Sequence, residues 1–317
     1  MPKRIKYRKI LIQEKSKEKY IMATQLITGT GCDLGIEFLE ENNIIWIPIT
    51  VIEGEKEYKD RIDIDAKTLF EKQREGIIFK TSQPSLKSQE ESFKKCIEEG
   101  KDIVYIALSS GITGEWSAAS MAIENLDKKG VRYKIVDTKS ASVGNALFVL
   151  YLNEAIKNGM PFEKVCEFAD FLTENVRAMA SVFDMTHLYN GGRVSKVSFT
   201  VGKLLNMKPI IHFERSGALV PKTVVKGNKA TIKKMIEIMK EEKGGSFTKN
   251  ERIITGHGST LEDVEVFEKA LRKEEDSLEI IRRDIGCGIG AHTGESVMAV
   301  GYITKPIPEE FEKYLNK

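Results

Sequence analysis

The sequence predicts an α/β protein of two domains: an N-terminal doubly wound parallel sheet, then a C-terminal α+β domain with a mixed sheet. Over residues 21–158, short apolar runs alternate with amphipathic helical runs, which is typical of a parallel sheet covered by helices. After residue 158 a β-hairpin pattern follows that the first half lacks. The length of 317 residues fits two domains. We expect them at residues 21–158 and 159–317, after a basic extension at residues 1–20.

The elements of the first domain are joined by short links. Strands are expected at residues 25–28, 44–52, 103–108 and 131–136, and helices at residues 36–41, 63–74, from 86, from about 116 to 126 and at 143–156. Residues 103–108 are apolar throughout, as in a central strand buried on both faces. Pro84 has no backbone N–H and Ser85 is a good N-cap, so a helix is predicted to begin at Leu86.

The second domain begins after a boundary at residues 158–161, where Pro161 suits a first helical turn. We predict helices through residues 165–176, up to Leu204 and Leu205, at 232–239 and at 261–271, with a polar linker at 241–250. Strands are predicted at residues 179–185, 209–213, 219–225, 252–255, 278–281 and 297–303, the second and third forming the hairpin around residues 215–217.

The composition is that of an ordinary globular protein, with 41% hydrophobic and 30% charged residues. A net charge of +2 gives no reason to expect a nucleic-acid partner. The basic excess lies in residues 1–20, which we interpret as a solvated tail or an added edge strand, with a membrane or partner patch as the alternative. Four widely spaced cysteines indicate a reduced protein without structural zinc. No apolar run approaches the ~20 residues of a membrane span, and no secretory signal is visible, so we expect a cytoplasmic protein without an integral membrane segment.

Two clusters of hydroxyl side chains, at residues 81–85 and 109–113, lie where a strand is expected to lead into a helix, and we expect the two strand ends to be adjacent. Ligands of doubly wound sheets bind at the carboxyl ends of strands, and helix N-termini favour anions. We therefore expect Thr81, Ser109 and Ser110 to contribute to an anion site. Serine and threonine are also common in caps and turns, so a structural role is the alternative.

Two glycine-rich segments hold further candidates. Arg193 follows Gly191-Gly192 and is either a solvated residue of a tight turn or a contact to an anion. His292 follows residues 286–291, which formally fit a dinucleotide motif; we expect a strand instead of the required helix after them, so no dinucleotide site is predicted. His292 is then a packing histidine or a donor to an anion. No phosphate-binding loop, serine-hydrolase elbow or metal-ligand motif is found in the sequence.

In this order the motifs resemble those of the DegV family, over about residues 22–305. The segments are Thr81-Ser82-Gln83-Pro84-Ser85, Ser109-Ser110-Gly111-Ile112-Thr113-Gly114, Asp137-Thr138 before Ser142, Gly191-Gly192-Arg193-Val194-Ser195 and Lys208-Pro209-Ile210. The resemblance implies a two-domain DegV-like fold that binds a long-chain fatty acid as its ligand, with no other cofactor. It implies that Thr81 and one or both of Ser109 and Ser110 hold the carboxylate, with His292 beside it and Arg193 near the site or a kinase interface.

The resemblance also implies a carrier, not an enzyme. Some members of the family present the fatty acid to a kinase related to dihydroxyacetone kinases, so such a kinase is a candidate partner. Burying the acyl chain would supply most of the affinity, at ~0.8 kcal/mol per methylene. Phe183, Leu204, Leu205 and Met235 are candidates for the tunnel lining, with ordinary core positions as the alternative.

Three departures from the family's motifs bear on kinase coupling more than on lipid binding. The motif Asp-Ser-Thr-x-Asp-Leu-Pro begins here with Gly29 and ends with Gly35, without its first Asp and its Pro. A Lys-x-Arg-Gly segment reads Val224-Val225-Lys226-Gly227, and a Gly-Pro-Gly segment reads Gly294-Glu295-Ser296.

Two other functions compete with the carrier. A serine-dependent hydrolase or phosphotransferase would use Ser110 with His292, but it needs an orienting residue that the sequence does not identify. A regulatory module would sense a lipid and bind a partner through residues 1–20. The length and saturation of the acyl chain and the oligomeric state are not specified by the sequence.

Overall fold

The computed structural model describes residues 23–183, 185–195 and 207–315. Its first sheet has four strands, all parallel. In sheet order they are β2 (Ile45–Ile47), β1 (Thr24–Gly29), β6 (Asp102–Ala107) and β7 (Tyr133–Asp137). β6 is buried along its whole length, which confirms the central strand that its apolar run predicts.

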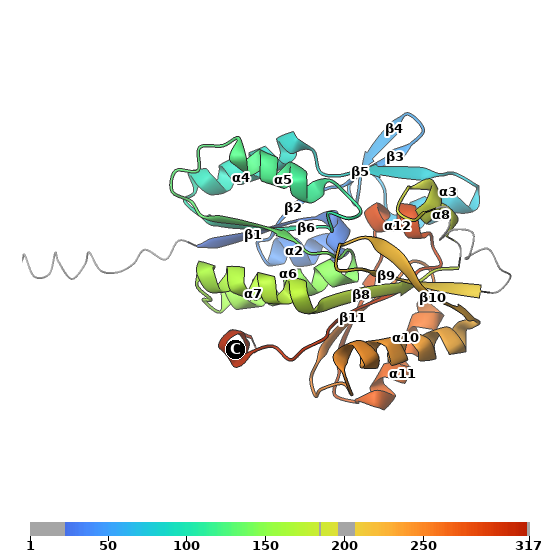
Figure 1. Cartoon of the computed structure of the whole chain (residues 1–317). Helices are drawn as coiled ribbons and strands as arrows, with labels where there is room; N and C mark the ends of the chain where they lie inside the picture. The colour runs from blue at the N-terminus through green and yellow to red at the C-terminus, as the bar shows by residue number, and fades with distance from the viewer. Residues whose placement is uncertain (1–22, 184, 196–206, 316–317) are drawn as a thin grey trace, which may run out of the picture.

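Helices cover both faces of the parallel sheet, which confirms the predicted doubly wound arrangement (Figure 1). One face packs against α4 (Leu86–Glu98) and α5 (Glu115–Glu124), and the other against α2 (Ile36–Glu41) and α6 (Val143–Lys157). The hydroxyl of Ser85 accepts the N–H of Ser88 (3.1 Å), so α4 begins at the predicted cap. Leu86 and Trp116, which the helical pattern predicts as packing positions, are 36% and 37% exposed.

The second sheet is mixed and has six strands, of which only β11 and β12 pair in parallel. In sheet order they are β10 (Leu219–Lys226), β9 (Met207–Phe213), β8 (Val176–Ser181), β13 (Met298–Ile303), β11 (Arg252–His257) and β12 (Glu279–Asp284). α10 (Asn228–Lys243) and α11 (Leu261–Glu274) cover its outer face. β9 and β10 form the predicted hairpin.

α6 lies between the two large sheets and contacts strands of both (Figure 1). α7 (Phe162–Asn175) packs beside it, and both helices belong to one hydrophobic core. This core contains residues from either side of the expected boundary, for instance Leu147 and Phe168. The division at residues 158 and 159 stays a prediction.

A third sheet, of three antiparallel strands, corrects two predictions. It consists of β4 (Lys56–Lys59), β3 (Thr50–Glu53) and β5 (Phe79–Ser82). The strand predicted at residues 44–52 is therefore two strands in two sheets, separated by Pro48, which has no N–H for a ladder. Thr81 lies on β5, so the two hydroxyl clusters do not follow neighbouring strands of one sheet.

Several other predicted elements differ at their ends or in type. The strand predicted at residues 179–185 ends at Ser181 and is followed by a short helix, α8 (Thr186–Asn190). The charged helix predicted at residues 63–74 is α3 (Ala66–Arg74), which begins directly after its N-cap residue, Asp65. The glycine-rich segment before His292 is itself a helix, α12 (Cys287–Thr293), where a loop was predicted. The helix predicted to reach Leu204 lies outside the described residues.

α12 packs on the N-terminal half of the chain, although it belongs to the C-terminal half by sequence. Cys287 and Ala291 share a core cluster with Val51 and Phe79 of the small sheet and with Leu69 of α3. The structure thus brings His292 against β5, where Thr81 lies.

Candidate functional site

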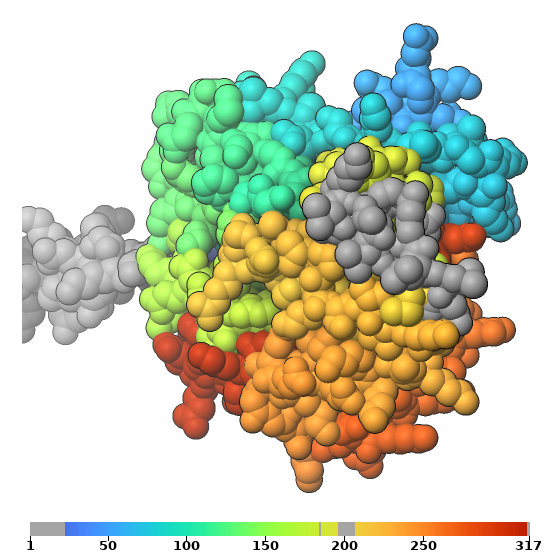
Figure 2. All heavy atoms as spheres, turned by 45° about the vertical axis from the view of Figure 1, so that its right-hand side comes forward, coloured from blue at the N-terminus to red at the C-terminus, as the bar shows by residue number. Residues whose placement is uncertain are grey.

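A largely apolar cavity lies between the two large sheets, below α12. It is lined by side chains of both halves of the chain: Ile49, Leu108, Ile112, Ala141 and Val143 from the first, and Ala178, Ala180, Ile211, Phe213, Leu219, Ile289 and Ala299 from the second. The space between these side chains, together with the opening to solvent, amounts to about 840 Å³. In Figure 2 the N-terminal half of the chain lies above the C-terminal half, and the two are packed against each other.

The lining differs from the predicted one. Met235 is fully buried in the core under α10 and α11 and does not line the cavity. Phe183 is 45% exposed, with the ammonium group of Lys208 3.7 Å from its ring centroid. Leu204 and Leu205 lie outside the described residues. The described wall is built instead by β8, β9 and β13, whose inner faces the strand pattern alone did not identify.

Thr81 and His292 meet at the wall of this cavity. Thr81 Oγ1 and His292 Nε2 are 2.7 Å apart, and both residues line the cavity. Burial, together with the charge of nearby Arg193, lowers the pKa of His292 to about 3. The imidazole is therefore neutral at pH 7 and carries a single N–H.

The second ring nitrogen of His292 lies against the backbone of Gly191. A Cβ at Gly191 would come within 2.1 Å of Nδ1, and this nitrogen has no hydrogen-bond partner among the described residues. When Nε2 holds the ring proton and donates it to Thr81, the Thr81 hydroxyl is left as a donor that faces the cavity. The pair can therefore hold an acceptor atom of a ligand.

Arg193 lines the same cavity, three residues beyond the end of α8. Its Nη1 donates to the carbonyl of Gly191, and desolvation lowers the pKa of the guanidinium, which stays charged at neutral pH. No carboxylate is paired with Arg193 in the part of the chain that the structure describes. A partly desolvated cation without a counter-ion favours an anionic ligand.

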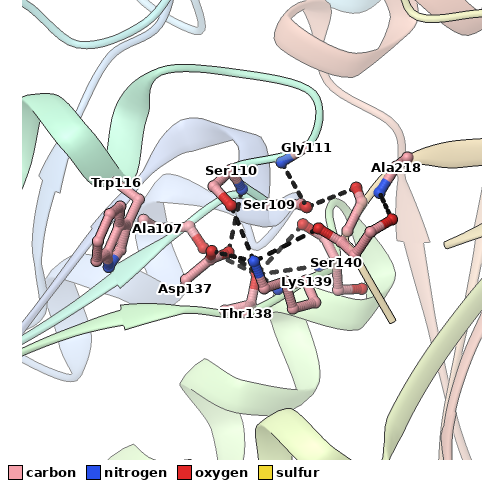
Figure 3. Close-up of polar contacts among 12 residues, drawn as sticks. Ala107, Ser109, Ser110, Gly111, Trp116, Asp137, Thr138, Lys139, Ser140 and Ala218 are labelled. Atoms are coloured by element: carbon pink, nitrogen blue, oxygen red, sulfur yellow. Dashed lines mark hydrogen bonds and ion pairs between the residues drawn. The ribbon is translucent and has the colours of Figure 1, made fainter. Parts of the chain in front are cut away.

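Ser109 and Ser110 are not part of the cavity lining. Figure 3 shows the polar contacts that they make with neighbouring segments. Ser109 is buried; its hydroxyl donates to the carbonyl of Gly217 (2.7 Å) and accepts the N–H of Gly111 (3.2 Å). Ser110 is exposed; its hydroxyl accepts from Lys139 (3.0 Å), and its N–H donates to Asp137. Neither is bonded to His292, whose Nε2 is paired with Thr81. A direct role of the two serines in holding a ligand stays a prediction.

Two buried aspartates fix the helix that carries His292. Asp33 accepts from Ser142 Oγ (2.6 Å) and the Gly286 N–H (2.9 Å), and pairs with Arg61 (3.2 Å). Burial raises the pKa of Asp33 to about 6. Asp60 accepts the first N–H groups of α12, those of Cys287 (3.2 Å) and Gly288 (3.3 Å). These contacts hold α12 against β5 and so position His292.

Five polar side chains of the cavity wall were missed by the sequence analysis as site residues: Gln83, Thr113, Glu115, Ser142 and Thr293. Gln83 and Thr113 lie inside motifs named above, and Glu115 follows the second of these motifs directly. Nothing local in the sequence distinguishes Glu115 from an exposed acid at a helix start, because its burial comes from packing against β1 and β6.

Metal and membrane sites find no support in the described residues. No group of three or more His, Cys, Asp or Glu side chains there is arranged to hold a metal ion. Among the same residues, no helix is both long enough and apolar enough to cross a bilayer.

Comparison with known proteins identifies the family. The family model described as "Uncharacterised protein, DegV family" matches residues 23–305. A DegV domain-containing protein of Clostridium acetobutylicum is 31% identical over 251 residues, which are 78% of this chain and 86% of that protein.

Solved structures show the same fold. DegV of Bacillus subtilis, described as a fatty acid binding protein, superposes with a TM-score of 0.78 at 26% identity, over 89% of this chain and 99% of that one. A Thermotoga maritima protein, whose structure is said to reveal a fatty acid binding function, gives 0.76 at 26% identity, over the same shares. The resemblance seen in the motifs is confirmed, and this chain belongs to the DegV family.

Proposed function

We propose that this protein binds a long-chain fatty acid, with its carboxylate at Thr81, Arg193 and His292 and its acyl chain in the apolar cavity. The observation that carries the proposal is Arg193, a cation with no ion pair among the described residues, at the wall of a cavity lined largely by apolar side chains. A molecule with one anionic end and a long apolar body matches both features.

The energetics agree with a ligand whose acyl chain supplies most of the affinity and whose carboxylate sets its orientation. Burying each methylene is worth ~0.8 kcal/mol, so a chain of about fourteen methylenes gains on the order of 10 kcal/mol before the costs of association. The polar contacts fix which end of the ligand lies at Thr81, because an unpaired carboxylate elsewhere in the cavity would be costly. Ser109 and Ser110 are not part of this proposed contact, since neither lines the cavity.

The relatives support the same class of ligand. The Bacillus subtilis and Thermotoga maritima proteins are described as binding fatty acids and cover 89% of this chain at 26% identity. We infer the same ligand class for this chain and leave the chain length and saturation of the ligand to experiment.

We infer further that the protein is a carrier and not an enzyme. Ser110, the nucleophile of the competing hydrolase hypothesis, is bonded to Lys139, and its main-chain N–H to Asp137, away from His292. A neutral His292 paired with Thr81 orients a ligand and does not activate that serine. A kinase that phosphorylates the presented carboxylate remains the partner that the family resemblance implies, and a cytoplasmic location agrees with four free cysteines.

Lipid extraction and native mass spectrometry of the purified protein test the proposal. We expect acyl chains to be released on denaturation, and the delipidated protein to bind palmitic acid much more tightly than its methyl ester, which lacks the charge that Arg193 pairs with. Absence of both co-purifying acyl chains and palmitate uptake would overturn it.

A further inference from the structure

The cavity holds a buried carboxyl that the proposed fatty-acid contacts do not use. Glu115, the first residue of α5, is fully buried and lines the cavity. Its Oε1 accepts the hydroxyl of Tyr105 (2.8 Å), and its Oε2 receives only a long contact from the backbone N–H of Leu108 (3.4 Å). A carboxylate offers about four acceptor positions, so these two donors leave it under-satisfied.

Gly29 at the end of β1 makes room for this carboxyl. A Cβ at Gly29 would lie 2.9 Å from Oε1 of Glu115. Gly29 is also the position at which this chain lacks the first Asp of the family motif, and the space beside its backbone is taken by a carboxyl from α5. At this edge of the parallel sheet, the acidic side chain is therefore Glu115 of α5, whereas the family motif places an Asp at the end of β1.

Glu115 calls for a ligand group that can both donate and accept a hydrogen bond. Burial raises the pKa of Glu115 to about 7, so the acid and the carboxylate are both populated near neutral pH. The carboxylate needs a donor, and the acid has an O–H to give. A hydroxyl satisfies both forms, whereas a methylene of a plain acyl chain satisfies neither and leaves a buried polar group unpaired.

The location of Glu115 is tied to the head-group end of the cavity through Gln83. Thr81 and Gln83 both line the cavity and lie two residues apart, roughly 7 Å in an extended chain. The Gln83 side chain accepts from Thr113 (3.4 Å), and its Oε1 lies 2.8 Å from where a Cβ on Gly114 would stand. Gln83, Thr113 and Glu115 thus line the cavity from two segments that meet at Gly114, and one of these segments also carries Thr81.

Resting on the proposed function, we propose that this cavity selects long-chain fatty acids that carry a hydroxyl group near the carboxyl end, and that Glu115 is the specificity-determining residue. Gln83 and Thr113 line the same part of the wall and present further groups to that hydroxyl. The remainder of the cavity is apolar and holds the unsubstituted part of the chain.

Competition binding to the delipidated protein tests this with three probes of equal chain length: palmitic, 3-hydroxypalmitic and 16-hydroxypalmitic acid. We expect 3-hydroxypalmitic acid to bind about tenfold more tightly than palmitic acid, a difference of about 1.4 kcal/mol. Glu115→Leu should abolish this gain without abolishing palmitate binding. Because Glu115→Leu removes the acceptor of the Tyr105 hydroxyl, the double variant Tyr105→Phe/Glu115→Leu is measured as well. Glu124→Gln, at an exposed acid of the same helix, is the matched control and should keep the gain.

The outcomes separate this inference from the proposed function. If none of the three acids binds, both the proposed function and the role of Glu115 are overturned. If palmitic acid binds and 3-hydroxypalmitic acid is no tighter, only the role of Glu115 is overturned. The role of Glu115 is also overturned if the tighter binding of 3-hydroxypalmitic acid persists in both variants that carry Glu115→Leu. It is likewise overturned if only 16-hydroxypalmitic acid binds more tightly than palmitic acid, because its hydroxyl lies at the end of the chain away from the carboxyl group.

Discussion

Ser109 Oγ donates a 2.7 Å hydrogen bond to the carbonyl oxygen of Gly217, and so ties the loop after β6 to the tip of the β9–β10 hairpin. The contact is close: a Cβ at Gly111 would lie 2.3 Å from the backbone of Gly217. Because Leu108 before this loop and Leu219 after the tip both line the cavity, the bond holds two opposite parts of its wall together. Ser109 thus has a structural role, the alternative that the sequence analysis left open for the hydroxyl clusters.

Ser109→Ala should lower the free energy of unfolding by about 1–3 kcal/mol, because it leaves a buried carbonyl without its donor. Urea denaturation measures this. Ser110→Ala, at the exposed neighbour, should change stability by less than about 0.5 kcal/mol. Equal stabilities of the two variants would contradict the role given to Ser109.

Thr81→Val should weaken palmitate binding by about tenfold or more, because it removes the hydroxyl that faces the cavity and keeps the side chain's shape. Hydrogen bonds to charged groups are worth about 1.5–3 kcal/mol. Isothermal titration of the delipidated protein measures the effect. Ser82→Ala is the control, since Ser82 is exposed on the same strand and does not line the cavity. Comparable losses in both variants would argue against a direct contact by Thr81.

Arg193→Gln should weaken binding of palmitic acid while leaving the weak binding of its methyl ester unchanged. The charge pairs with a carboxylate and has nothing to gain from an ester. Fluorescence displacement with both ligands measures the ratio of their affinities, which should fall at least several-fold. A parallel loss for acid and ester would show that Arg193 shapes the cavity and does not recognise the charge.

Gly191→Ala should disturb the ligand site without disturbing the backbone, because the new methyl group would collide with His292 Nδ1 at 2.1 Å. We expect the Thr81–His292 contact to break and palmitate affinity to fall, while the protein stays folded. Imidazole NMR signals of His292 and palmitate titration report the two effects. Gly245→Ala is the control, since a Cβ there meets nothing within 4 Å. Unchanged His292 signals would contradict the predicted displacement.

Local sequence signals predicted much of this fold. The apolar run of β6, the cap at Ser85 and the hairpin around residues 215–217 each act over a few residues, and each is found where it was expected. The break at Pro48 also had a local signal, a residue without an N–H, and was missed because β2 and β3 together read as one apolar run.

The remainder of the site depends on contacts between distant segments. The glycine-rich α12 is helical although glycine disfavours helices, since Asp60, more than 200 residues earlier, accepts its first N–H groups. The directions of Ser109 and Ser110 are set by Gly217 and Asp137. Sequence periodicity and residue propensity carry no information about contacts between such distant residues. The motifs therefore indicated which segments form the site, but not which side chains face the cavity.

Stability should depend on pH through Glu115. Burial raises the pKa of this carboxyl from 4.5 to about 7, so between these pH values the folded protein holds a proton that the unfolded chain has lost. The contribution of Glu115 to stability is therefore present below about pH 4.5 and is lost as the pH rises to 7. Glu115→Gln lacks this titration. The stability of the parent protein relative to the variant should fall by up to about 3 kcal/mol from pH 4 to pH 8.

Urea denaturation of both proteins across that pH range measures the difference. His292, whose pKa is lowered, contributes the opposite slope below pH 6.5, but it is present in both proteins and cancels. Glu124→Gln, at an exposed carboxyl of the same helix, is the control. Hydrogen bonds from Tyr133 and Lys128 lower the pKa of Glu124, so its removal should not reproduce the difference between pH 5 and pH 8. Parallel curves for the parent and Glu115→Gln would mean that Glu115 titrates as an ordinary carboxyl. That result would also remove the acid form on which the match to a ligand hydroxyl partly depends.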